Sequence, residues 1–304
     1  MDQPTINEIR PENIICEEIV TQETQAKNIE WQVLRLDKIH PVISGNKWFK
    51  LKYYLEAAGS RGFKGIVTFG GAYSNHIIAA AYAARLAGLS STGIIRGEEP
   101  LEWSHTLIEA GKYGMELHFV SREAYAQKKD ADVAKNFPGC FVIPEGGYGE
   151  PGAKGAAEIF QYVNSSSFDY TCCACGTGTM LAGLLDAAGE PMNCIGISVL
   201  KGQTDLAEKV TGLLPGEKRK RQFSIIHDFH FGGYAKKNSA LLEFMNNFYL
   251  QHNIPTDFVY TGKLMFAVDR LIRNNFFPRG SRILAIHSGG LQGNRSLPPG
   301  TLVF

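Results

Sequence analysis

A lysine follows a Gly-Asn turn in the segment Ser44-Gly45-Asn46-Lys47, and Lys50 and Lys52 come shortly after it in a helical pattern. A helix N-terminus disfavours a protonated amine, which lowers the pKa of a lysine placed there and makes it a better nucleophile. Lysines of this kind form Schiff bases with carbonyl compounds. The spacing does not choose among the three lysines, and a solvated surface lysine is the ordinary alternative.

Glycine and threonine alternate in the segment Cys175-Gly176-Thr177-Gly178-Thr179, between a predicted strand and a predicted helix. The unpaired backbone N–H groups at a helix start can hold a phosphate, and glycine lets the backbone approach it closely. The dinucleotide fingerprint fails because Leu181 stands at its third glycine. Elsewhere in the chain, Gly147 and Gly152 have the P-loop spacing, but that pattern fails because Ala153 follows where lysine is required. These residues predict a phosphate cradle without nucleotide specificity, with a simple tight turn as the alternative.

A second turn between a predicted strand and a predicted helix, Gly70 to His76, carries polar side chains. Ser74 or Asn75 would serve as the helix N-cap, which is the structural interpretation. In the functional interpretation, Ser74, Asn75 and the backbone N–H groups of the turn bind a carboxylate or move a proton.

The elements that must position these turns follow from hydrophobic periodicity. Short apolar runs, about nine strands in all, alternate with helical patterns between residues 47 and 287, which is typical of an α/β protein with parallel sheets. Two such units side by side are expected, with ligands near the carboxyl ends of the strands. The segment Glu145–Gly152 is expected to be a flexible crossing between them. The helical patterns span residues 48–59, 74–88, 104–114, 121–136, 152–163, 179–189, 237–249 and 261–273.

Composition excludes several classes of protein. The 304 residues carry 31 Lys and Arg against 30 Asp and Glu, a balance that argues against binding nucleic acid through bulk charge. The N-terminal residues do not form a signal peptide, and the longest uncharged stretch carries polar residues in its middle, so the cytoplasm is the expected compartment and no membrane partner is expected. The cysteines of the run Cys172–Cys175 are interpreted as core residues, and no metal site is expected.

A nucleophilic lysine combined with a phosphate cradle on an α/β sheet suggests pyridoxal 5'-phosphate, which needs both. The rival hypothesis from another class is a dinucleotide-dependent oxidoreductase, which the broken fingerprint at Leu181 disfavours. A protein that binds pyridoxal phosphate with little activity is a third possibility.

Six segments, in order, resemble the 1-aminocyclopropane-1-carboxylate deaminase / D-cysteine desulfhydrase family of pyridoxal-phosphate lyases, which has the two-domain tryptophan-synthase-β-like fold. They are SGNKWFKLKYYLEAA, VTFGGAYSNH, CGTGT, FGGYAK, VYTGKLMFAVDRLI and AIHSGG. The resemblance implies a larger cofactor domain of residues 1–49 and 156–304 and a smaller domain of residues 50–155. It also implies a homodimer that acts on a small amino acid.

The resemblance assigns roles to individual residues. Lys47 would be the Schiff-base lysine and Ser74 the active-site serine. Asn75 would hydrogen-bond the ring oxygen of the cofactor, and His76 would lie at the wall for the substrate carboxylate. The remaining assignments are the phosphate loop Gly176, Thr177, Gly178 and Thr179, two active-site tyrosines, Tyr234 and Tyr260, and the positions Thr261 and Ser288, where the activities of the family differ.

Those last two positions bear on the substrate. Family members that open the cyclopropane ring carry Glu and Leu where this chain has Thr261 and Ser288. A neutral threonine near the ring nitrogen leaves that nitrogen less protonated than a carboxylate would. We therefore expect β-elimination from D-cysteine or a similar D-amino acid, with 1-aminocyclopropane-1-carboxylate deamination as the alternative. The sequence departs from the family at Trp48-Phe49, which replace Thr-Arg, and at Met180, where a hydroxyl residue is common.

Overall fold

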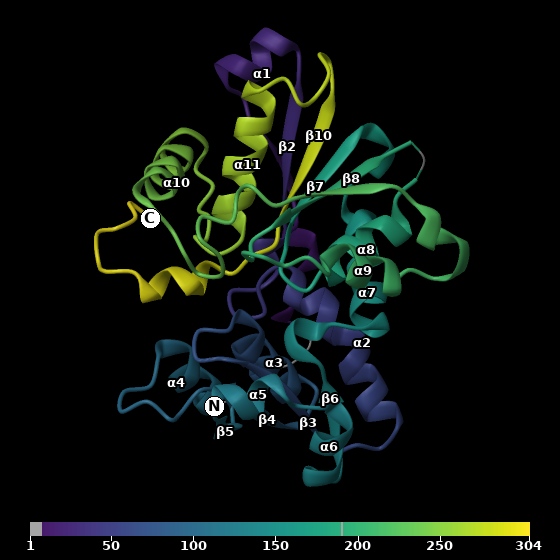
Figure 1. Ribbon diagram of the computed structural model, residues 1–304, viewed down its shortest axis with the longest axis vertical. Helices are drawn as coiled ribbons and strands as arrows, with labels where there is room; N and C mark the ends of the chain where they lie inside the picture. Colours follow the sequence, from purple (N-terminus) through teal and green to yellow (C-terminus); the bar gives the residue numbers. More distant parts are fainter. Residues whose placement is uncertain (1–7, 190) are drawn as a thin grey trace.

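The computed structural model describes residues 8–189 and 191–304, and it contains a six-stranded sheet and a four-stranded sheet (Figure 1). The strand orders are β1-β2-β10-β7-β8-β9 and β5-β4-β3-β6. Only the pairing of β1 with β2 is antiparallel among the named strands of these residues. The expected α/β class with parallel sheets is confirmed. The strands are β1 (Cys16–Glu18), β2 (Glu30–Arg35), β3 (Gly65–Gly71), β4 (Ser90–Arg96), β5 (Met115–Val120), β6 (Cys140–Ile143), β7 (Tyr170–Cys175), β8 (Asn193–Ser198), β9 (Phe223–Ile226) and β10 (Arg282–His287).

Helices connect the strands and cover both sheets. They are α1 (Gln22–Lys27), α2 (Asn46–Ser60), α3 (Asn75–Leu86), α4 (His105–Lys112), α5 (Arg122–Ala126), α6 (Asp130–Asn136), α7 (Glu150–Ala157), α8 (Thr179–Ala187), α9 (Leu206–Gly212), α10 (Ser239–His252) and α11 (Thr261–Arg273). Across the two described ranges, no helix is both long enough and apolar enough to cross a membrane.

The large sheet is buried on both faces because the middle positions of its central strands β7, β8 and β10 are apolar. Successive residues of a strand point to opposite faces. Accordingly, Cys172 and Ala174 of β7 pack in one hydrophobic cluster with α11, while Cys173 and Cys175 pack in another with α8. All four side chains are buried, which confirms the interpretation of these cysteines as core residues.

Helix α2 and the segment after β6 run from one sheet to the other. Small residues on α7 let it pack closely against both α2 and α8. The segment Glu145–Gly152 is packed rather than loose, since the Tyr54 hydroxyl donates a hydrogen bond to the Tyr148 carbonyl at 2.7 Å. The predicted domain boundary at residues 49/50 falls inside α2, and the exact domain limits stay a prediction.

Three expectations about secondary structure were incomplete or wrong. The helix expected at residues 121–136 is divided into α5 and α6, because Lys129 is extended between them. The helix expected at 152–163 is α7 followed by a 3-10 turn, Glu158–Tyr162. The N-terminal residues contribute β1 and β2 to the large sheet, although the pattern of alternating elements was recognised only from residue 47 onward.

Candidate active site

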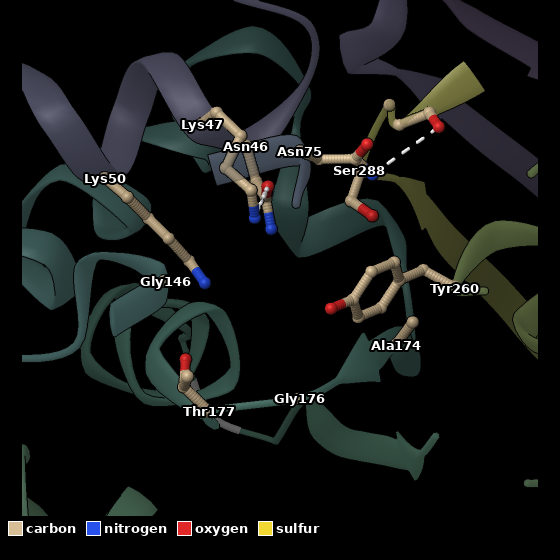
Figure 2. A pocket seen from close by; sticks show the side chains of 12 residues that line it. Asn46, Lys47, Lys50, Asn75, Gly146, Ala174, Gly176, Thr177, Tyr260 and Ser288 are labelled. Carbon is tan, nitrogen blue, oxygen red and sulfur yellow. Dashed lines mark hydrogen bonds between the residues drawn. The ribbon is translucent and has the colours of Figure 1, made fainter. Parts of the chain in front are cut away.

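The carboxyl ends of the parallel strands face a cleft between the two sheets. Its outer part is a cavity of about 910 Å³. Its narrower inner part is lined mainly by α2, the turn after β7 and the turn after β10 (Figure 2). The sequence predicted twelve site residues, and nine of them lie in the lining of one or both parts of the cleft. These nine are Lys47, Ser74, Asn75, His76, Gly176, Thr177, Tyr234, Tyr260 and Ser288. Gly178, Thr179 and Thr261 are buried behind the wall.

Lys47 is the second residue of α2, and the backbone before it is fixed by a contact with the large sheet. The N-cap residue Gly45 has φ +65°, and a Cβ there would lie 1.9 Å from the Ser288 carbonyl oxygen, so only glycine fits. The Asn46 N–H donates to the same oxygen at 3.2 Å. Burial lowers the pKa of Lys47 to about 8, against the opposing effect of the Asp257 charge. Part of the Lys47 population is therefore a neutral, nucleophilic amine near neutral pH.

The structure distinguishes the three lysines that the spacing left equivalent. Lys52 pairs with Glu158 and lines neither part of the cleft. Lys50 is buried one turn after Lys47 and points into the inner part of the cleft, on the side of Thr177 (Figure 2). Burial, followed by the charge of Lys47, lowers the pKa of Lys50 to about 7. Sequence reasoning considered Lys50 only as an alternative nucleophile to Lys47, although its spacing from Lys47 places both on one helix face.

The glycine-threonine segment joins β7 to α8, as expected. Gly178 caps α8 with φ +81°, and a Cβ there would lie 2.7 Å from Val210 Cγ2. The hydroxyls of Thr177 and Thr179 are 2.9 Å apart. Gly176 and Thr177 therefore present the backbone and one hydroxyl to the cleft, while Thr179 supports Thr177 from behind.

The turn after β3 has the expected helix cap, and its polar residues also reach the cleft, while their binding role stays a prediction. Ser74 caps α3, because its Oγ accepts hydrogen bonds from the N–H groups of His76 and Ile77 at 3.2 and 3.4 Å. Ser74 also lines the outer part of the cleft. Asn75 donates through Nδ2 to the Gly290 carbonyl at 3.5 Å, but its buried Oδ1 has no partner in the structure. A buried polar atom without a partner is costly, which favours a ligand group at this position.

His76 is neutral, and its tautomer follows from its contacts. Burial, and next the charges of Lys47 and Lys50, lower the pKa of His76 well below its usual value. The Thr68 hydroxyl already donates to the Ile143 carbonyl, so it must accept from His76 Nε2, 2.8 Å away. The Nδ1 atom of His76 is left as an acceptor without a partner.

The two predicted tyrosines meet at the cleft. The rings of Tyr234 and Tyr260 are edge to face, with centroids 6.2 Å apart, and Lys47 Nζ lies 6.0 Å from the Tyr260 ring centroid. Burial raises the pKa of Tyr260 well above its usual value, and burial also raises the pKa of Tyr234. Both phenols are neutral and can donate hydrogen bonds.

Two buried residues that sequence reasoning missed hold these tyrosines in place. The Asp257 carboxylate accepts hydrogen bonds from the backbone N–H groups of Val259, Tyr260 and Thr261 at 2.8–3.0 Å. Lys263 is fully buried and donates to the carbonyls of His230 and Gly233, in the turn that leads to Tyr234. An aspartate two to four residues before those N–H groups was the available sequence signal.

Thr261 has a different place from the one expected. Its hydroxyl donates to Asp257 Oδ1 at 2.8 Å and accepts from the Asp257 N–H at 2.7 Å, and its side chain is fully buried. Thr261 is a buried partner of Asp257, not a wall of the cleft, contrary to the expected substrate contact. Ser288, the other position that distinguishes activities, does line the inner part.

The departures at Trp48, Phe49 and Met180 also lie away from the cleft lining. Phe49 and Met180 are buried in the main hydrophobic cluster, and Trp48 packs against it. Met180 Sδ accepts a hydrogen bond from Asn46 Nδ2 at 3.4 Å. These departures therefore bear on the packing beneath α2 rather than directly on the substrate pocket.

The inner part of the cleft offers a specific set of groups. It is faced by two buried amines, a glycine turn with a threonine hydroxyl, an unpartnered amide oxygen and a serine hydroxyl. None of the described residues that line it carries a carboxylate. An anion such as a phosphate fits the amines and the glycine turn. A carbonyl compound fits the nucleophilic amine of Lys47.

The comparisons with known proteins agree with this chemistry. Residues 20–289 match the family model described as pyridoxal-phosphate dependent enzyme. A protein of Thermotoga maritima named putative 1-aminocyclopropane-1-carboxylate deaminase is 31% identical over 281 residues, covering 86% of this chain and 88% of its own length. A bifunctional D-cysteine desulfhydrase/1-aminocyclopropane-1-carboxylate deaminase of Arabidopsis thaliana is 29% identical, covering 83% of this chain and 70% of its own.

Solved structures show the same architecture. The crystal structure of an ACC deaminase homologue superposes with a TM-score of 0.80 at 26% identity, covering 93% of this chain and 90% of the other. A threonine deaminase isoform from Solanum lycopersicum superposes with a TM-score of 0.63 at 13% identity, which shows a shared fold alone.

Proposed function

The chain belongs to the pyridoxal-phosphate-dependent enzymes, as a lyase or deaminase of the 1-aminocyclopropane-1-carboxylate deaminase family, and we propose that it eliminates a β-substituent from a small D-amino acid. The products are a 2-oxo acid and ammonia. The single observation that carries this choice is the inner part of the cleft, where Ser288 contributes a hydroxyl and no described lining residue is a carboxylate.

The residues of the inner part fit the cofactor. Lys47 would bond its aldehyde, and Gly176, Thr177 and Lys50 would hold its phosphate. Tyr260 would lie beside its ring, and Asn75 and Ser288 would meet the polar atoms of the ring. When bound, pyridoxal phosphate withdraws electrons from the α-carbon of an amino acid.

The protein residues then have distinct tasks. The backbone turn at Ser74 and Asn75 holds the substrate carboxylate, and His76 stands neutral beside it with a free acceptor at Nδ1. Lys47 Nζ accepts the proton from the α-carbon, which its lowered pKa of about 8 makes possible near neutral pH. The bond between the β-carbon and its substituent breaks, and the substituent leaves with the electron pair. The released 2-aminoacrylate reacts with water to give pyruvate and ammonia.

A lining without a carboxylate suits elimination better than ring opening. A carboxylate at the ring nitrogen would keep that nitrogen protonated and strengthen electron withdrawal, and no described residue of the inner part supplies one. Elimination of a thiolate or chloride needs less withdrawal because the leaving group is already good. The alternative, deamination of 1-aminocyclopropane-1-carboxylate, is favoured by the name of the Thermotoga relative, whereas the Arabidopsis relative is named for both activities.

Turnover of three compounds by the purified protein with its cofactor separates these proposals. We expect D-cysteine and β-chloro-D-alanine to give pyruvate much faster than 1-aminocyclopropane-1-carboxylate gives 2-oxobutyrate. Comparable or faster turnover of the cyclopropane acid would refute the argument from Ser288 and support the alternative.

A further inference from the structure

Arg96 is the last residue of β4, and its side chain lies at the outer part of the cleft without a carboxylate partner. Its Nη2 atom reaches to 3.5 Å from where a Cβ on Gly71 would lie, and its guanidinium is 5.7 Å from the centre of the Tyr125 ring. Within the described ranges no Asp or Glu oxygen lies within 4.0 Å of Arg96, while two lysines of the same cavity do have such partners. Lys128 pairs with Glu145 at 3.4 Å, and Lys209 pairs with Asp205 at 2.7 Å.

Arg96 also lies close to the groups of the proposed reaction. Gly71 begins the turn that leads to Ser74, where the substrate carboxylate is placed. Burial raises the pKa of Tyr234, and the positive charge of Arg96 opposes that rise, so the guanidinium and the phenol are within electrostatic reach. Arg96, Tyr234 and Lys47 line the same cavity.

The cleft has more room and more positive charge than a small neutral amino acid uses. The outer part measures about 910 Å³, and a second cavity of about 490 Å³ shares Ala72 and Arg96 with it. D-Cysteine and 1-aminocyclopropane-1-carboxylate each carry one carboxylate, which the Ser74 turn accounts for. Neither has a group for the guanidinium. The charged residues that line the outer part are Lys47, Arg96, Lys128, Lys209 and Lys237 against Asp130 and Glu145.

We propose that Arg96 binds an anionic β-substituent, so that the preferred substrates are amino acids with a phosphate or carboxylate group beyond the β-carbon. The planar guanidinium forms paired hydrogen bonds with such anions. This inference rests on the proposed β-elimination and deepens it. With O-phosphoserine, the α-proton passes to Lys47 Nζ and the Cβ–O bond breaks. Phosphate leaves with the electron pair beside Arg96, and water then converts the aminoacrylate to pyruvate and ammonia.

Paired substrates test the proposal in the protein loaded with its cofactor. The value of kcat/KM is measured for O-phosphoserine and β-chloroalanine of the same configuration, for both enantiomers. We expect the wild type to prefer O-phosphoserine at least tenfold. Arg96→Gln should lower kcat/KM for O-phosphoserine by about 10- to 100-fold, the range expected for a lost charge-assisted pair, and lower that for β-chloroalanine much less. Arg96→Lys keeps the charge but lacks the paired donors of the guanidinium, so its kcat/KM for O-phosphoserine should lie between those of the wild type and Arg96→Gln.

A matched control separates a specific contact from overall charge. Lys209→Gln removes one positive charge from the same cavity, at a residue already paired with Asp205, and should retain the preference for O-phosphoserine. Equal loss on both substrates in Arg96→Gln, or loss of the preference in Lys209→Gln, would overturn the proposal.

If neither compound turns over, that result counts against the proposed elimination itself. Binding measured by calorimetry then tests the role of Arg96 separately. O-Phosphoserine should then still bind the wild type at least tenfold more tightly than Arg96→Gln. Equal affinity for the two proteins would reject the role of Arg96.

Discussion

Replacing Lys50 with Met removes a buried amine and tests whether this lysine holds the phosphate of the cofactor. The pKa of about 7, in place of 10.5, corresponds to about 5 kcal/mol against the charged form at ~1.36 kcal/mol per pH unit. A phosphate dianion close to the amine reverses this effect and raises the pKa by ~1–3 units. At pH 8 the free protein carries about nine-tenths neutral Lys50, so binding of the dianion draws in about 0.4 to 0.9 proton, depending on the size of that rise.

The assay uses pyridoxine 5'-phosphate, which lacks the aldehyde and cannot bond Lys47. Calorimetric titration at pH 8, in buffers of different ionisation enthalpy, gives both the affinity and the number of protons taken up. The wild type should take up about 0.4 to 0.9 proton more than Lys50→Met and should bind about 10- to 100-fold more tightly, the range for hydrogen bonds to a charged group.

Lys52→Met is the matched control, because Lys52 belongs to the same helix but pairs with Glu158 away from the cleft. Its affinity and proton uptake should equal those of the wild type. If Lys50→Met binds as tightly as the wild type with the same proton uptake, Lys50 does not meet the phosphate and the reasoning fails.

Three further changes test the supports of the site. Lys263→Met should speed amide hydrogen exchange in residues 230–235 and lower activity. It should lower activity no further when Tyr234 is already Phe, because its effect acts through Tyr234. Additive losses of activity in the double variant would argue that Lys263 does not position Tyr234. Burial would raise the pKa of Asp37, but His287 and then Arg35 hold it well below its usual value. Asp37→Asn should therefore cost about 3–5 kcal/mol of unfolding free energy above pH ~4, and the difference should shrink gradually as the pH falls toward the lowered pKa; a deficit as large at pH ~2 as at pH ~6 contradicts this. Gly178→Ala should lower stability by about 1–2 kcal/mol for its positive φ and weaken binding of pyridoxine 5'-phosphate; unchanged affinity would place the phosphate elsewhere.

Periodicity predicted the elements that carry most of the site. β3 and α11 have the expected limits, because each is bounded by clear turn residues and has a regular apolar pattern. The strand β2 was missed because its polar end does not look like a buried strand. Arg35 is buried there because Asp37, two residues later, and Glu17, from β1, both pair with it. The pairing with Glu17 is a tertiary effect that a local pattern does not contain.

The site was predicted where a residue type and a turn coincide, as at Lys47, Ser74 and Gly176. It was not predicted where the proposed role depends on burial or on the absence of a partner. Lys50 and Arg96 look like ordinary charged residues in the sequence, and only the structure shows one buried in the cleft and the other without a carboxylate. Thr261 was misplaced for the same reason, since its bonds to Asp257 turn the side chain away from the cleft.

The central claim is that Lys47 bonds the cofactor, and one measurement tests it directly. The purified protein, loaded with pyridoxal phosphate, is reduced with borohydride and digested, and the modified residue is located by mass spectrometry. The label should be on Lys47, and the visible absorbance of the cofactor should be lost in Lys47→Ala while the far-UV circular dichroism is unchanged. A label on Lys50 or Lys52, with Lys47 unmodified, would contradict the account.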